Sequence, residues 1–281
     1  MTATILLVLK LSIVSLIFAI GLGSTPADLT NLWRRPTQLL RSLLAMYVLV
    51  PVAALSAVRI LPLGVAVETA MLVLAISAGA PMLPRKLMKI GREGYVFSLV
   101  VTSSLLAVVA VPAWLAVIGP LFGRESTVEP RAVALVIAKA FLAPLLVGML
   151  LRWPLSKVAE RLSDWILGAA GAALTVAGLA LLALHGNLLL EVGWIPLLSL
   201  VGMTVVALAI GHAVGGPDPG DRTALAVCCS TRHVGIAMLA ASTARGPKVI
   251  ALVLAYVIAS AVVSIPYLKW RGRAAGASSS V

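Results

Sequence analysis

Apolar stretches of about 20 residues recur along this chain, separated by short polar turns that contain Pro or Gly. A stretch of this length can cross the hydrocarbon core of a bilayer as an α-helix, which satisfies its backbone hydrogen bonds internally. The composition agrees, because 61% of the residues are hydrophobic and only 11% are charged, against about 25% charged in soluble domains. We therefore predict an all-α integral membrane protein that contacts the lipid bilayer along most of its length.

The apolar stretches predict about nine transmembrane helices. The expected spans are residues 4–22, 37–57, 64–84, 95–119, 131–151, 163–184, 190–212, 222–243 and 248–268. They form a single transmembrane domain over residues 1–270, and the small and polar residues of 271–281 predict a disordered tail. The first span could instead be a cleaved signal peptide. Lys10 interrupts it and no basic segment precedes it, so we expect a helix.

The basic residues are divided unequally between the two sets of connecting loops. Most of the 22 basic residues lie on loops after odd-numbered spans and in the C-terminal tail. The positive-inside rule then places the C-terminus in the cytoplasm and the N-terminus outside, in a multi-pass protein of the cell membrane. The net charge of +12 follows from this topology. We predict no nucleic-acid partner, because the arginines are not interleaved with aromatic residues on one face.

Two of the predicted spans contain polar or helix-breaking residues. The third ends in a segment with Pro81, Pro84 and Arg85, and the eighth contains Ser230, Thr231, Arg232 and His233 in succession. An arginine at the bilayer centre costs roughly 2.5–3.5 kcal/mol, so Arg232 requires a partner, a ligand or water. Interrupted segments in both halves of a membrane chain are typical of secondary transporters, with the site between them. We predict that two broken helices cross at a central cavity.

Several motifs, in order, resemble the bile acid:sodium symporter family. They are residues 18–23 with the following Asp28, the arginine pair before Pro36, the Ser- and Thr-rich segment 98–104, and segment 230–240. The resemblance implies two inverted five-helix repeats whose broken helices cross. This chain resembles members that lack the first of the ten helices. The implied function is secondary active transport of a small organic anion by alternating access.

The family's sodium ligands are only partly matched. Ser98 and Thr102 lie four residues apart on one helical face and match a pair of hydroxyls that binds sodium in the family. Arg85 and Cys228 stand where the family has Asn and Glu, and Arg232 with His233 stands where it has Gln and Asn. Sodium prefers oxygen ligands, so we predict transport that does not use these sodium sites. A sodium-coupled symporter is the alternative.

The candidate substrate- and ion-binding residues are therefore Arg232, His233, Thr231, Ser230, Ser98, Thr102 and Arg85. Arg232 could clamp a carboxylate or replace the charge of a bound ion. His233 could carry a proton or could hydrogen-bond a neighbour. Arg85 could belong to a cytoplasmic basic cluster. The hydroxyls of Ser98 and Thr102 could instead serve helix packing. Asp218 and Asp221 predict a solvated loop with a helix N-cap.

No sequence pattern predicts a cofactor, a metal site or a catalytic group. The chain has no phosphate-binding Gly-rich loop and no nucleophile elbow, and its three histidines are not accompanied by a carboxylate cluster. We therefore do not expect an enzyme. A receptor or scaffold that does not transport is the other open class, and it would not require broken helices at corresponding places.

Overall fold

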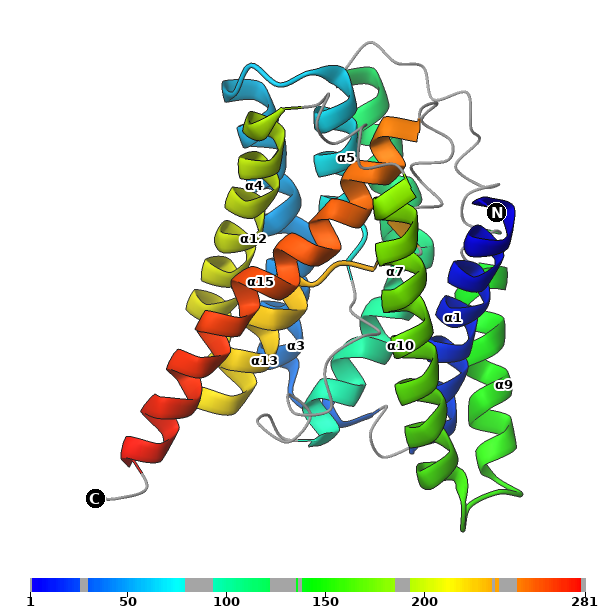
Figure 1. The fold of residues 1–281 in the computed structure, drawn as a ribbon. Coiled ribbons are helices and arrows are strands. Elements are labelled where there is room, and N and C mark those ends of the chain that lie inside the picture. The colour runs from blue at the N-terminus through cyan, green and yellow to red at the C-terminus, as the bar shows by residue number, and fades with distance from the viewer. Residues whose placement is uncertain are drawn as a thin grey trace.

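The computed structural model describes residues 2–25, 30–78, 93–121, 135, 138–184, 193–233, 236–237 and 247–278. Every regular element within these ranges is a helix, as Figure 1 shows. Five of the helices are long and apolar enough to cross a membrane, namely Pro36–Ile60, Ser98–Pro120, Ala159–Ala180, Trp194–Val214 and Lys248–Arg273. The chain is an all-helical, multi-pass membrane protein, as predicted. The expected number of nine spans stays a prediction.

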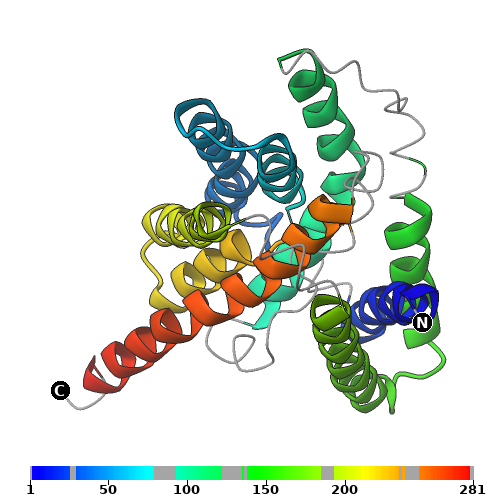
Figure 2. The ribbon, with the colours of Figure 1, turned by 45° about the horizontal axis from the view of Figure 1, so that its top comes forward.

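Three helices form one compact unit, visible at the lower right of Figure 2. These are α1 (Thr2–Gly23), α9 (Ala143–Arg152) and α10 (Ala159–Leu184). A Cβ atom on Gly21 would lie 2.2 Å from the carbonyl oxygen of Leu145, and one on Gly148 would lie 2.2 Å from that of Phe18. Small residues let membrane helices approach to backbone contact, which is what holds α1 against α9.

The remaining helices form a second, larger unit (Figures 1 and 2). Its first helix is continuous from α3 (Pro36–Leu44) through the π-helix η1 (Ala45–Leu49) to α4 (Val50–Ile60). The others are α5 (Val65–Ile76), α7 (Glu93–Leu121), α12 (Trp194–Val214), α13 (Pro219–Ser230) and α15 (Pro247–Ser278). A second π-helix, η2 (Ala138–Leu142), leads into α9 of the three-helix unit.

The short helices α5 and α13 enter from opposite ends of the molecule and end in its middle (Figure 1). Side-chain hydroxyls accompany both ends, since the Ser77 Oγ donates to the Val73 carbonyl at 2.6 Å and the Thr231 Oγ1 donates to the Val227 carbonyl at 2.6 Å. Each carbonyl also accepts the backbone N–H of the same residue, at 3.2 and 2.8 Å, so the hydroxyl adds a second hydrogen bond at the last turn. Helix α5 thus ends before Pro81. Pro81, Pro84 and Arg85 lie outside the described residues.

Helix α15 differs from its expected length. We predicted a span that ends near residue 268 and a disordered tail over 271–281, but the helix continues to Ser278. Alanine and arginine residues in this segment are among the best helix formers, and Arg271 fixes its start by donating to Thr223 Oγ1 and to the Pro219 carbonyl.

Candidate functional site

The ends of α5 and α13 meet directly. The backbone N–H of His233 donates to the carbonyl oxygen of Ser77 at 2.9 Å, one residue past the end of α5. Both helices present their C-terminal ends here, and each such end carries a partial negative charge. The chain leaves α13 in an extended conformation at Thr231, with φ −90° and ψ 114°. Arg232 therefore lies where two helix dipoles favour a cation.

The guanidinium group of Arg232 is buried and only partly hydrogen-bonded. The residue is 4% exposed, and its Nη1 donates to the Met46 carbonyl at the long distance of 3.4 Å. Its Nε and Nη2 atoms are buried and make no hydrogen bond of normal geometry, although the Tyr256 hydroxyl interacts with the guanidinium. No ion pair joins it to an acidic side chain of the described residues. Nε and Nη2 form the side-on edge of a guanidinium, which can donate two parallel hydrogen bonds to a carboxylate.

His233 is completely buried, and neither of its ring nitrogens has a partner. Its ring meets Phe141 edge to face, with ring centroids 4.3 Å apart and an interplanar angle of 87°. Phe141 belongs to η2, and Met46, which contacts Arg232, belongs to η1. π-Helical segments often occur at functional sites. The π-helices η1 and η2 thus each contact one of the two residues at the crossing.

The hydroxyls of Ser230 and Thr231 bond to their own helix. The Val227 carbonyl accepts from the Ser230 Oγ at 3.0 Å and from the Thr231 Oγ1 at 2.6 Å. The Ser230 carbonyl accepts a hydrogen bond of 2.6 Å from the hydroxyl of Tyr256 on α15. These residues shape the end of α13 beside Arg232. Tyr256 was missed from the sequence, because a single tyrosine in an apolar span is also typical of packing.

Ser98 and Thr102 lie on α7 and are both buried. The Ser98 Oγ accepts from the Leu32 backbone N–H at 3.0 Å, and the Thr102 Oγ1 accepts from Trp33 Nε1 at 3.3 Å. The hydroxyl pair thus anchors the turn that follows α1 to α7. Among the described residues, no hydrogen bond joins this pair to Arg232 or His233.

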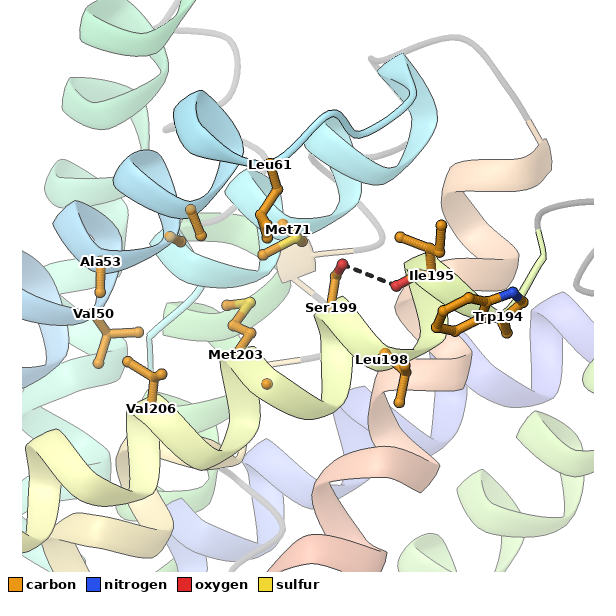
Figure 3. Close-up of a pocket in the computed structure, with 13 residues that line it drawn as sticks. Val50, Ala53, Leu61, Met71, Trp194, Ile195, Leu198, Ser199, Met203 and Val206 are labelled. Carbon is orange, nitrogen blue, oxygen red and sulfur yellow. Dashed lines mark hydrogen bonds between the residues drawn. The ribbon is translucent and has the colours of Figure 1, made fainter.

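A cavity of about 460 Å³ lies elsewhere, between α4, α5 and α12 (Figure 3). Its walls are mainly apolar, and the Ser199 hydroxyl that borders it donates to the Ile195 carbonyl at 2.9 Å. It is lined by Val50, Ala53, Ala54, Ala57, Leu61, Met71, Trp194, Ile195, Leu198, Ser199, Gly202, Met203 and Val206. No charged group is among them, so this cavity cannot recognise an anion by charge.

A comparison with protein families identifies a match over most of the chain. The family model of the Sodium Bile acid symporter family matches residues 10–210, which include α5 and α7 and stop before α13. Among curated proteins, no match was found. The match covers well over half of the 281 residues. The chain belongs to the Sodium Bile acid symporter family, a family of membrane transporters.

Proposed function

We propose that this protein is a secondary active transporter of a small organic anion, and that Arg232 supplies the positive charge of its substrate site. The observation that carries the proposal is the unpartnered Nε and Nη2 edge of a guanidinium buried between two helix ends. A carboxylate or sulfonate would complete its hydrogen bonds. The convergence of α5 and α13 supports two inverted repeats and alternating access around this point.

Sodium coupling is less favoured by the same geometry. Two unit charges 4 Å apart repel by about 4 kcal/mol at an effective dielectric constant near 20, so a cation beside Arg232 would bind weakly. The Ser98 and Thr102 oxygens already accept hydrogen bonds from the turn after α1. We propose transport that does not require sodium, with the N-terminus outside and the C-terminus in the cytoplasm. Sodium-coupled symport is the second candidate, and the family's name supports it.

Uptake into proteoliposomes tests both candidates. The probe is a labelled taurine-conjugated bile acid, whose sulfonate stays ionised at any working pH. Initial rates are measured with sodium and with sodium replaced by choline. An unchanged rate in choline supports the proposal, whereas a steep and saturable sodium dependence would favour the second candidate.

The variant Arg232→Gln tests the role of the guanidinium. A hydrogen bond to a charged group contributes about 1.5–3 kcal/mol, so we expect initial uptake to fall at least about tenfold. Arg273→Gln is the matched control, because Arg273 is exposed near the end of α15 and should retain uptake. Wild-type uptake by Arg232→Gln would refute the assignment. No uptake by the wild-type protein of any organic anion tested would favour a receptor or scaffold.

A further inference from the structure

Asp221 is a buried carboxylate without a cationic partner among the residues that the structure describes. We predicted a solvated position for it, but the residue is only 2% exposed. Its Oδ2 accepts a hydrogen bond of 2.7 Å from Gln38 Nε2 on α3, and its Oδ1 is buried without a partner. No ion pair joins Asp221 to a described lysine or arginine. The burial corrects the prediction and leaves a polar atom that the fold does not use.

Helix capping does not account for Asp221. The expected N-cap is confirmed at Asp218, whose Oδ1 accepts from the backbone N–H groups of Gly220 and Asp221 at 2.9 and 3.0 Å. An acidic residue three positions after the N-cap can reach back to complete a capping box. Asp221 has this position, yet its side chain bonds across to α3 instead. The start of α13 is therefore stabilised without the Asp221 carboxylate.

Two nearby arginines, the neighbouring Arg222 and Arg271 on α15, are engaged elsewhere. Arg222 donates through Nε and Nη2 to the Gly216 carbonyl at 3.0 and 2.7 Å, and Arg271 donates to Thr223 Oγ1 and to the Pro219 carbonyl, both at 2.9 Å. The elements packed against α13 carry the further titratable or charged groups Arg41, Tyr47, Glu93, Tyr95, His212, Lys248, Tyr256, Tyr267, Lys269 and Arg273. Of these, Tyr95 on α7 interacts electrostatically with Asp221, and it is neutral.

The cost of burying the Asp221 carboxylate favours the binding of a cation that can also be released. An unpaired buried carboxylate costs several kcal/mol. The N-terminus of a helix returns about 0.3–1 kcal/mol, up to about 2 in partly buried geometry, and the bond from Gln38 about 1.5–3 kcal/mol. A proton on Oδ1 removes the charge altogether. It has a short route, because Pro217 and Pro219 in the preceding turn are exposed, on the side that we assign to the cytoplasm.

We propose that Asp221 is the proton-binding residue of this protein and couples proton binding to anion binding at Arg232. The inference rests on the proposed transport function. The step is a simple protonation, in which the carboxylate takes up one proton from solvent and later returns it, with no change of oxidation state.

One continuous helix connects the two groups. Gln38 at the start of α3 contacts Asp221 near the N-terminus of α13. Met46 in η1 contacts Arg232 just past the C-terminus of α13. Protonation of Asp221 converts a charge-assisted hydrogen bond from Gln38 into a weaker neutral one. Helix α13 is then freer to move along α3 and η1, which changes the 3.4 Å contact of Arg232 with Met46. Coupling of this kind is reciprocal, so a bound anion also changes proton affinity.

The test uses proteoliposomes and the taurine-conjugated bile acid. Counterflow at equal pH on both sides measures transport alone, and accumulation under a gradient of one pH unit measures coupling. One proton per anion allows up to about tenfold accumulation, because one pH unit corresponds to 1.36 kcal/mol. Asp221→Asn should keep counterflow and lose the accumulation. Asp218→Asn is the matched control in the same turn, and it should keep both because asparagine also caps helices.

Three results would overturn the inference. They are a wild-type protein that shows counterflow but no response to the pH gradient, an Asp221→Asn variant that still accumulates the probe, and an Asp218→Asn variant with the same loss as Asp221→Asn.

If Asp221→Asn does not fold, Gln38→Met takes its place, since it removes the connecting donor but keeps the carboxyl group. It should keep counterflow and lose at least half of the accumulation, and full accumulation would refute the coupling route. Absence of counterflow in the wild type would instead refute the proposed transport of this probe.

Discussion

Helices α1 and α9 are so close at Gly148 that the position has no room for a side chain. A Cβ atom there would lie 2.2 Å from the carbonyl oxygen of Phe18 and 2.8 Å from the backbone nitrogen of Leu22. Backbone atoms cannot rotate away, so Gly148→Ala must separate the helices by about 1 Å. A gap of this size forfeits roughly a quarter to a half of the dispersion energy at the contact. We expect the free energy of unfolding to fall by about 1–3 kcal/mol, the usual cost of overpacking.

Thermal unfolding of the purified protein in one detergent measures this effect. A change of 1 kcal/mol shifts the unfolding midpoint by about 2–4 °C in a chain of this size class. Gly168→Ala is the matched control, because Gly168 lies inside α10 and nothing stands within 4 Å of its added Cβ atom. Alanine favours helix by up to about 1 kcal/mol over glycine, so the control should be unchanged or more stable. A Gly148→Ala midpoint at or above that of Gly168→Ala would refute the close packing.

Three further substitutions test individual contacts. Tyr256→Phe removes the donor to the Ser230 carbonyl and should lower the unfolding midpoint by an amount equivalent to about 1–3 kcal/mol; an unchanged midpoint would contradict this. Arg152→Gln removes the guanidinium that donates to the last two carbonyls of α1 at 2.8 and 3.1 Å, so we expect a loss of about 1–2 kcal/mol in thermal unfolding, and Arg152→Lys should lose less. Thr102→Val removes the acceptor of the Trp33 indole but should keep initial uptake of the probe within about threefold of wild type, a cost under 1 kcal/mol. A loss of sodium-stimulated uptake in Thr102→Val would show that this hydroxyl binds the ion.

The sequence predicted those features that depend on local composition. Apolar stretches identified a helical membrane protein, and α13 ends at Ser230, the first residue of the polar run that we expected to interrupt the eighth span. We predicted the break in the third span near Pro81, but the helix ends earlier in the chain. Helix α5 already ends at Ile76, where Ser77 bonds to a carbonyl of its own helix, and a serine within an apolar stretch does not by itself indicate such an end.

Features that depend on distant contacts were not predictable. The burial of Asp221 depends on Gln38, which is 183 residues away in the chain. The π-helices η1 and η2 are each followed, two residues after their end, by a proline, Pro51 and Pro144. A proline inside a helix removes a backbone donor and disturbs the preceding turn, but a proline in an apolar span does not by itself indicate a π-helix. The roles of Ser98 and Thr102 likewise depend on the turn after α1, which approaches α7 only in the folded chain.

Arg232 has two explanations, and the directions of its hydrogen bonds distinguish them. A guanidinium kept only to neutralise the ends of α5 and α13 should donate to the free carbonyls there, but the Ser77 carbonyl accepts from His233 and the Ser230 carbonyl from Tyr256. Each of these carbonyls already has a donor, and neither Nε nor Nη2 of Arg232 bonds to either of them. Each buried donor without a partner costs about 1–3 kcal/mol, and both ring nitrogens of His233 are in the same condition. An anion at the crossing would satisfy the two guanidinium donors together, which is why we assign the substrate site to this position.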